Sequence, residues 1–148
     1  MGRPLEPRDP GYEAAVRDSF ALQGFMTTLG ARLVHVAPGE VDIELPCAPA
    51  LSQQDGFVHG GATTSVLDTA CGYAAMTLVA PGVRGLTVDF TVHLLEPAQG
   101  ERIVAQGRVV RGGRTLTVSR GEAFAVEGEE RVLVAVMTAT IVTMAPRA

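Results

Sequence analysis

The stretch that decides the fold runs over residues 60–80 and reads GGATTSVLDTACGYAAMTLVA. It is too long and too rich in alanine for a strand, and Pro81-Gly82 follows it, so we predict a helix over residues 60–80. Small or apolar side chains occupy nearly every face, which is expected of a helix that is wrapped by a sheet. Asp68 is the one charged residue within this helix.

Apolar residues that alternate with polar ones, or run continuously, predict strands on both sides of this helix. Before it we predict a helix over residues 12–28, strands over 31–37 and 40–45 joined by a Pro38-Gly39 turn, and a loop over 46–59. After it we predict strands over residues 86–94, 102–111, 114–126 (with Gly121 a candidate bulge) and 131–144 (a central strand, apolar on both faces). Hairpin-length turns imply antiparallel pairing. The expected class is α+β, one long antiparallel sheet around a central helix.

The composition predicts a single domain over residues 1–148, in which proline-rich residues 1–11 form an extended tail. A net charge of −4 argues against a nucleic-acid binder. The first ten residues contain no apolar run, and no stretch approaches the roughly 20 apolar residues of a membrane span, so we expect neither signal peptide nor membrane association. Two cysteines without ligand spacing and three scattered histidines predict a reduced, cytoplasmic protein without a metal.

Asp68 is the strongest candidate for chemistry. Burying an ionised carboxylate among apolar neighbours costs several kcal/mol unless it is paired, so its place in this helix suggests a function. The alternative is a carboxylate on a solvated strip. His59 lies just before the helix, where a buried structural histidine is the competing interpretation. Gly60 and Gly61 allow the backbone to approach a ligand, and the first helical N–H groups can polarise a carbonyl oxygen.

The spacing of these residues has a structural consequence. Gly60 and Asp68 are eight residues apart, which is about 12 Å along a helix. A carbonyl held by the Gly60 N–H therefore cannot be attacked with help from Asp68 of the same chain. Two antiparallel copies of the helix would bring Gly60 of one chain beside Asp68 of the other. If both residues are catalytic, a homodimer is required for the site.

The stretch from Gln53 through His59-Gly60-Gly61 to Asp68 resembles the motif of hotdog-fold thioesterases of the phenylacetate-degradation (PaaI-like) type and their mammalian relatives. Residues 85–90 (GLTVDF), 96–98 (EPA) and 110–114 (VRGGR) belong to the same resemblance, which covers roughly residues 20–143. It implies the hotdog fold and hydrolysis of an acyl- or aryl-CoA thioester to free acid and CoA. Coenzyme A is then part of the substrate, and no cofactor is expected.

The resemblance also implies roles for individual residues. Asp68 would act as general base or nucleophile, and the Gly60 N–H of the partner chain would hold the thioester oxygen. Gln53 stands where relatives often carry asparagine and would position water. Thr87 stands where some relatives carry serine and would hydrogen-bond that water or Asp68. The backbone of Val88 and Asp89 and the turn bearing Arg111 and Arg114 would follow the coenzyme A arm, with solvated turn cations as the alternative for the arginines. Beyond the homodimer, we expect a homotetramer.

Two other functions fit the same residues. A hotdog-fold enoyl-CoA hydratase or dehydratase would use a histidine and an acid together, and His59 with Asp68 could form that pair. A non-catalytic acyl-CoA-binding module would not need an acid at the position of Asp68. The acyl group is left open, although Gly72, Tyr73 and Met76 lie on a helix face that could shape its pocket.

Overall fold

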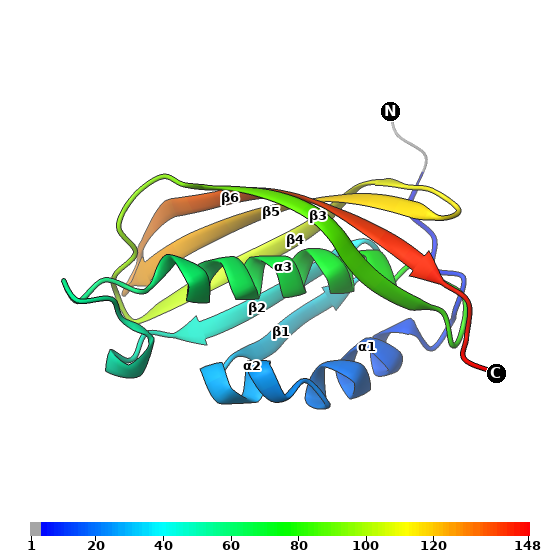
Figure 1. Ribbon diagram of the computed structural model, residues 1–148, viewed down its shortest axis with the longest axis horizontal. Coiled ribbons are helices and arrows are strands. Elements are labelled where there is room, and N and C mark those ends of the chain that lie inside the picture. The colour runs from blue at the N-terminus through cyan, green and yellow to red at the C-terminus, as the bar shows by residue number, and fades with distance from the viewer. Residues whose placement is uncertain (1–3) are drawn as a thin grey trace.

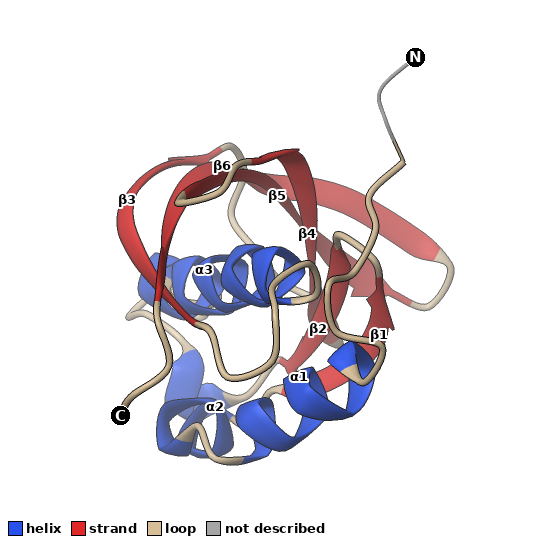
Figure 2. Cartoon of the chain, turned by 90° about the vertical axis from the view of Figure 1, so that its right-hand side faces the viewer, coloured by secondary structure: helices blue, strands red, loops and turns tan. Residues whose placement is uncertain are grey.

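The helix predicted at the centre of the sequence is α3 (Gly60–Met76), and an antiparallel sheet curls around it (Figure 1; Figure 2). The computed structural model describes residues 4–148, so residues 1–3 of the predicted tail lie outside the described part. The end-on view shows α1 and α2 lying below α3, on the side that the sheet leaves open. This arrangement confirms the predicted α+β hotdog fold.

The elements follow one another in nearly the predicted order. The helices and strands are α1 (Tyr12–Ala21), α2 (Gly24–Leu29), β1 (Arg32–Ala37), β2 (Glu40–Pro46), the 3₁₀ helix η1 (Pro49–Leu51), α3, β3 (Arg84–Leu94), β4 (Arg102–Gly112), β5 (Leu116–Glu127) and β6 (Glu130–Met144). The spatial order of the strands is β1-β2-β4-β5-β6-β3, with every neighbouring pair antiparallel. No helix within residues 4–148 is long and apolar enough to cross a membrane.

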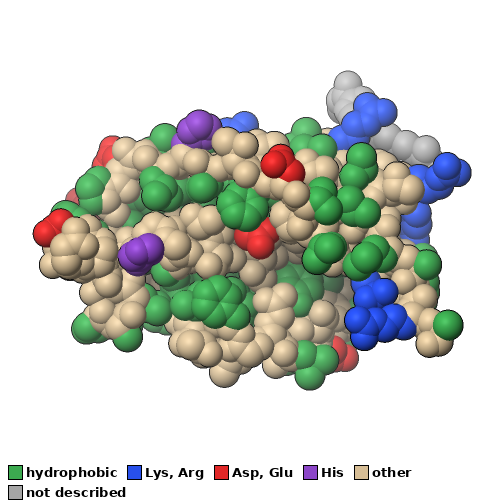
Figure 3. Space-filling model, in the orientation of Figure 1, with side chains coloured by type: hydrophobic (Ala, Val, Ile, Leu, Met, Phe, Trp, Pro, Cys, Tyr) green, Lys and Arg blue, Asp and Glu red, His purple; other side chains and the backbone are tan. Residues whose placement is uncertain are grey.

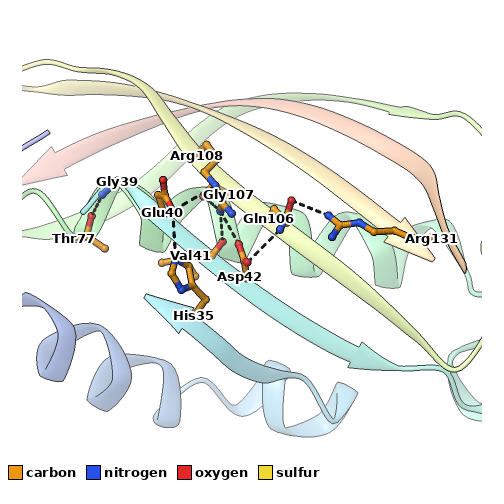
Figure 4. Close-up of polar contacts among 10 residues, drawn as sticks. All are labelled: His35, Gly39, Glu40, Val41, Asp42, Thr77, Gln106, Gly107, Arg108 and Arg131. Carbon is orange, nitrogen blue, oxygen red and sulfur yellow. Dashed lines mark hydrogen bonds and ion pairs between the residues drawn. The ribbon is translucent and has the colours of Figure 1, made fainter. Parts of the chain in front are cut away.

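The two faces of the sheet are set by alternation along the strands. In β2, Val41, Ile43 and Leu45 are fully buried toward α3, and the acidic residues between them lie on the outer face. There the Arg108 guanidinium contacts Asp42 at 2.6 Å, and Gln106 joins Asp42 to Arg131 (Figure 4). Polar pairs therefore cover the outer face, while the apolar face is available to the central helix.

Glycines on β4 and β5 let α3 lie close against the sheet. Gly107 and Gly121 are paired partners in the two strands. A Cβ on Gly107 would lie 2.3 Å from the Ala70 carbonyl oxygen, and one on Gly121 would lie 2.9 Å from the Cys71 sulfur. The predicted bulge at Gly121 is wrong, because its pairing is regular and its missing side chain serves packing against the helix.

Two predicted helices end differently from expectation. The helix expected over residues 12–28 is divided into α1 and α2, because Gln23 adopts an extended conformation before Gly24. The helix expected to reach residue 80 ends at Met76. The Thr77 hydroxyl donates to the Ala74 carbonyl and accepts from the Gly39 N–H, both at 2.7 Å, which ties the end of α3 to the β1–β2 turn (Figure 4).

Strand β3 forms an edge of the sheet and contains a bulge. It pairs with β6 only, and the register shifts between Thr87 and Asp89, so Val88 is the extra residue. The sequence predicts strict alternation from Leu86 to Leu94, but Thr87 faces α3 and so does Val92, five positions later. A strict period of two would put these residues on opposite faces, and the bulge brings them to the same one.

Candidate active site

Asp68 lies in the middle of α3, with Leu67 beside it fully buried. Its Oδ1 is buried and has no hydrogen-bond partner among the described residues. A buried carboxylate oxygen without a partner is costly in a folded protein and is expected where a substrate or catalytic water completes its contacts. Asp68 as a whole is half-buried, and one of its two carboxylate oxygens has no partner among the described residues.

Thr87 faces the same part of α3 from β3. A Cβ built on Gly72 would lie 3.9 Å from the Thr87 hydroxyl oxygen, and Gly72 is one helical turn after Asp68. Both Asp68 and Thr87 line one cavity of about 630 Å³. The structure thus brings together two of the five predicted catalytic residues within a single chain.

This cavity lies between the central helix, the start of β3 and the N-terminal helices. Gly72, Tyr73 and Met76 line it, as the sequence suggested for an acyl pocket. The sequence did not predict the opposite wall of the cavity. This wall is formed by residues of α1 and α2 and by Gln23, which precedes α2. Its residues are Tyr12, Ala15, Val16, Ser19, Gln23, Phe25 and Met26. These residues are more than 35 positions from Asp68, and the only sequence signal for them is the apolar character of the predicted helix.

The N-terminus of α3 carries the second predicted feature. The His59 Nδ1 accepts a hydrogen bond from the Gly61 N–H at 2.8 Å, and the His59 carbonyl accepts from the Ala62 and Thr63 N–H groups. The Gly60 N–H has no hydrogen-bond partner among residues 4–148. His59 is exposed, not buried, because it caps the helix from outside. Gly60 is thus the free donor at this helix end.

Gln53 lies in the loop before α3, near the same end as Gly60. Its backbone N–H donates to the Phe57 carbonyl at 2.9 Å, and its side-chain oxygen accepts from the Asp55 N–H. Gln53 and His59 are absent from the lining of the Asp68 cavity, as is the Gly60 N–H. Within one chain, the predicted catalytic residues therefore form two groups, at the middle and at the start of α3.

The residues predicted to follow the coenzyme A arm are exposed. Val88 and Asp89 lie at the β3 bulge, and Arg111 and Arg114 flank the β4–β5 turn. The Thr143 N–H donates to the Thr115 carbonyl at 3.0 Å, and Thr143 pairs with Gly85 in β3. This turn and the start of β3 therefore lie at the same end of the sheet. Arg114 lines a small cavity of about 240 Å³ there.

Cys71 is buried one helical turn after Asp68, and its thiol is unreactive. Burial, together with the charge of Asp68, raises the pKa of the Cys71 thiol to about 12. A thiol held protonated in this way is neither a nucleophile nor a metal ligand near neutral pH. Cys71 therefore serves packing, against the space left by Gly121.

Comparison with known proteins agrees with the fold and the motif. The family model described as the thioesterase superfamily matches residues 55–132, which include the start and middle of α3 and the strands up to β6. A thioesterase family protein from Silicibacter pomeroyi has 47% sequence identity and a TM-score of 0.89, covering 91% of this chain and 99% of that one. The fold is therefore the hotdog fold of thioesterases.

Two further matches are consistent with this family. Acyl-coenzyme A thioesterase 13 of Homo sapiens is 33% identical over 85 residues, covering 57% of this chain and 60% of that protein. The PaaI protein from the phenylacetic acid degradation operon of E. coli has a TM-score of 0.83 at 16% identity, covering 94% of this chain and 97% of that one, and this likeness concerns the fold alone. This chain aligns with 60–66% of the length of several curated relatives. It belongs to the thioesterase superfamily, as the sequence motif predicted.

Proposed function

We propose that this protein is an acyl-CoA thioesterase, which hydrolyses an acyl- or aryl-CoA to the free acid and CoA. The observation that carries the proposal is the Asp68 carboxylate, which lines a cavity large enough for an acyl group and has one buried oxygen without a partner among the described residues. Membership of the thioesterase superfamily supports the reaction class. The relative named acyl-coenzyme A thioesterase 13 supports the choice of an acyl-CoA substrate.

Asp68 can serve this reaction in two ways. As a general base it accepts a proton from water, whose oxygen attacks the thioester carbon while Thr87 orients the water or the carboxylate. As a nucleophile it forms a mixed anhydride with the acyl group, which water then opens. In both routes the C–S bond breaks, and CoA leaves as a thiolate that takes up a proton. A developing negative charge on the thioester oxygen needs a donor, and the Gly60 N–H expected for this role lies outside the cavity lining of its own chain.

We further propose that the donor is the Gly60 N–H of the partner subunit. Edge strand β3 exposes the apolar side chains of Leu86, Val88, Phe90 and Leu94, and hydrophobic groups line this face of the molecule (Figure 3). Such an edge is suited to pairing with a second copy of the same strand. Antiparallel pairing of two β3 strands would continue the sheet and place the two α3 helices antiparallel.

The contacts of β3 set the register that this dimer needs. Gly60 packs beside Leu94, where a Cβ would lie 2.6 Å from the Leu94 Cδ1, and Gly72 packs beside Thr87. A two-fold antiparallel pair centred on Thr91, counted past the extra residue Val88, puts Leu94 of one chain opposite the bulge at Thr87 of the other. Gly60 of the partner subunit then approaches the Thr87 and Asp68 side of the site.

The same pairing explains the separation of the other predicted residues. Gln53 and His59 belong to the Gly60 end of the chain, so they would also enter the site from the partner subunit. The Gln53 amide can then position water, and the free ring nitrogen of His59 can orient the site. Arg111 and Arg114 supply positive charge for the phosphates of the coenzyme A arm. Assembly of two such dimers into a tetramer is part of the proposal.

Replacing Asp68 tests the proposed function. We expect Asp68→Asn and Asp68→Ala to lower CoA release from acyl-CoA substrates by at least about a hundredfold, because the positioned acid–base group is lost. Melting temperature and oligomeric state serve as controls for folding. Wild-type turnover by a folded Asp68→Ala protein would exclude the assignment.

The substrate panel separates the remaining alternatives. Hydration of an enoyl-CoA without release of thiol would indicate a hydratase, and tight binding of acyl-CoA without any product would indicate a binding module. A single turnover in heavy-oxygen water tests for the nucleophilic role of Asp68, because only that role can label the protein. Attack by water labels the acid product, whereas an anhydride that is opened at the Asp68 carbonyl labels the protein.

A further inference from the structure

A cluster of three polar side chains lies on the cavity wall away from β3. Tyr73, only 7% exposed, places its hydroxyl oxygen 2.9 Å from the Ser19 hydroxyl oxygen and 3.1 Å from the Gln23 amide nitrogen, which donates to it. Phe20 packs edge-on against the Tyr73 ring, with ring centroids 6.1 Å apart. All three polar residues line the same cavity as Asp68.

The donors and acceptors of this cluster cannot all be paired with one another. Ser19 and Tyr73 each carry one hydroxyl hydrogen, and only one of them can lie between the two oxygens. The other hydroxyl hydrogen has no recorded acceptor within residues 4–148, and neither does the Gln23 side-chain oxygen have a donor there. One donor and one acceptor are therefore open to a ligand in the cavity.

Part of the remaining lining is apolar, although Asp9, Ser65, Thr69 and Arg84 also border the cavity. Val16, Met26 and Ile141 are buried and border the cavity, and Met76 packs against them. Such a surface suits methylene groups, and a polar cluster beside it can discriminate between ligands by the hydrogen bonds that it offers. Of the three side chains only Tyr73 is buried, whereas Gln23 is half-buried and Ser19 is exposed. Tyr73 follows Asp68 by five positions, about 7.5 Å along the helix axis, so the cluster lies several bonds away from a thioester carbon at Asp68.

We propose that Ser19, Gln23 and Tyr73 bind an oxygen substituent, hydroxyl or carbonyl, near the far end of the acyl chain. The proposal rests on the thioesterase function and adds a substrate class to it: acyl-CoAs of medium length that carry an oxygen beyond the thioester. The thioester carbonyl lies at Asp68, the methylene groups contact the apolar wall, and the distal oxygen exchanges hydrogen bonds with the cluster.

Matched substrate pairs test this specificity. Each pair consists of a straight-chain acyl-CoA and the ω-hydroxyacyl-CoA of equal length, over chains of about four to ten carbons. We expect kcat/KM to favour the hydroxylated member by about tenfold at the length that reaches the cluster, the scale of one added hydrogen bond. The preference is measured from CoA release.

Two tyrosine variants identify the residue responsible. Tyr73→Phe keeps the ring that packs on Phe20 and removes the hydroxyl, so the preference should fall to within about twofold of unity. Tyr12→Phe removes a hydroxyl from another residue lining the same cavity and should retain the preference. A purely structural role of the cluster, which would anchor α1 to α3, would lower the melting temperature of Tyr73→Phe without changing the preference.

The outcome does not depend on turnover alone. Binding of the same pairs to the Asp68→Asn protein, followed by calorimetry, should show the same ratio of affinities and its loss on adding Tyr73→Phe. The proposal would be overturned if the straight-chain and ω-hydroxyacyl-CoA had equal kcat/KM and equal affinity at every chain length. It would also be overturned if the preference persisted in Tyr73→Phe. Failure of wild-type protein to release CoA from any acyl-CoA would instead overturn the thioesterase function.

Discussion

Replacing Gly60 by proline would remove the proposed oxyanion donor while keeping a residue suited to the start of α3. Gly60 is the first residue of α3, and its N–H has no partner among the described residues. Proline is well tolerated at the first helical position, since its missing N–H is one that the helix does not use. The preceding residue, His59, already has φ −59° and ψ 133°, a conformation that a following proline favours.

Gly60→Ala is the matched control. Both variants add a Cβ, which would lie 2.6 Å from the Leu94 Cδ1, and the exposed Leu94 side chain can rotate away in both. Only the proline variant lacks the N–H. The difference between the two proteins therefore isolates the hydrogen-bond donor from the steric change.

The expected loss follows from the chemistry of oxyanion donors. Removing one such donor typically lowers kcat by about 10²–10³, equivalent to about 2.7–4 kcal/mol of transition-state stabilisation. We expect this loss for Gly60→Pro relative to Gly60→Ala, with melting temperatures that agree within a few degrees. CoA release is followed with a thiol-reactive chromophore at saturating acyl-CoA. Equal kcat in two folded variants would refute the role of Gly60.

Mixing variants tests whether the site is shared. Gly60→Pro and Asp68→Ala chains are each inactive alone, but a mixed dimer has one site with both residues intact. Random reassociation makes half of the dimers mixed, each with one working site of two, so about a quarter of wild-type activity should return. No recovery in a mixture that demonstrably exchanges subunits would show that the site is contained within one chain.

Three further outcomes follow from other parts of the structure. Gly107→Ala should lower the free energy of unfolding, measured with urea, by about 3 kcal/mol or more, because the added Cβ would overlap the Ala70 carbonyl. The control Gly24→Ala, whose Cβ meets no atom within 4 Å, should change it by less than about 1 kcal/mol. Phe90→Glu places like charges near the centre of the proposed β3 pair, and sedimentation should show monomers that have lost at least about a hundredfold in turnover. The folded pKa of Cys71 lies above its usual 9.0, so its contribution to stability is complete below about pH 9 and falls as the pH rises toward 12. Cys71→Ala should therefore lose that part of the decline in unfolding free energy between about pH 9 and pH 12.

The sequence is most informative where one local pattern determines the structure. The length and alanine content of residues 60–80 predicted α3, and its lone charge singled out Asp68, whose Oδ1 is buried without a partner among the described residues. The apolar periodicity of β2 predicted which side chains face the helix. These features depend on near neighbours in the chain, so they are visible without knowledge of the tertiary structure.

Features that arise from contacts between distant segments were missed. Residues 86–94 alternate without interruption, and the bulge at Val88 arises because Thr87 and Val92 must both face α3. The role of Gly121 depends on how close the helix comes to the sheet. The cluster of Ser19 and Gln23 with Tyr73 joins residues at least 50 positions apart, which no local pattern in one sequence indicates.

Because α3 packs closely on Gly107, the position of the Asp68 carboxylate and the shape of the acyl cavity depend on different parts of the fold. The Ala70 backbone rests on the sheet two residues from Asp68, so the position of the carboxylate is set by main-chain contact instead of by exchangeable side chains. The opposite cavity wall comes from α1 and α2, which lie on the far side of the helix from the sheet. Substitutions in α1 and α2 can therefore alter which acyl groups fit while the hydrolytic machinery keeps its geometry, and new substrate preferences can evolve in this scaffold without a new active site.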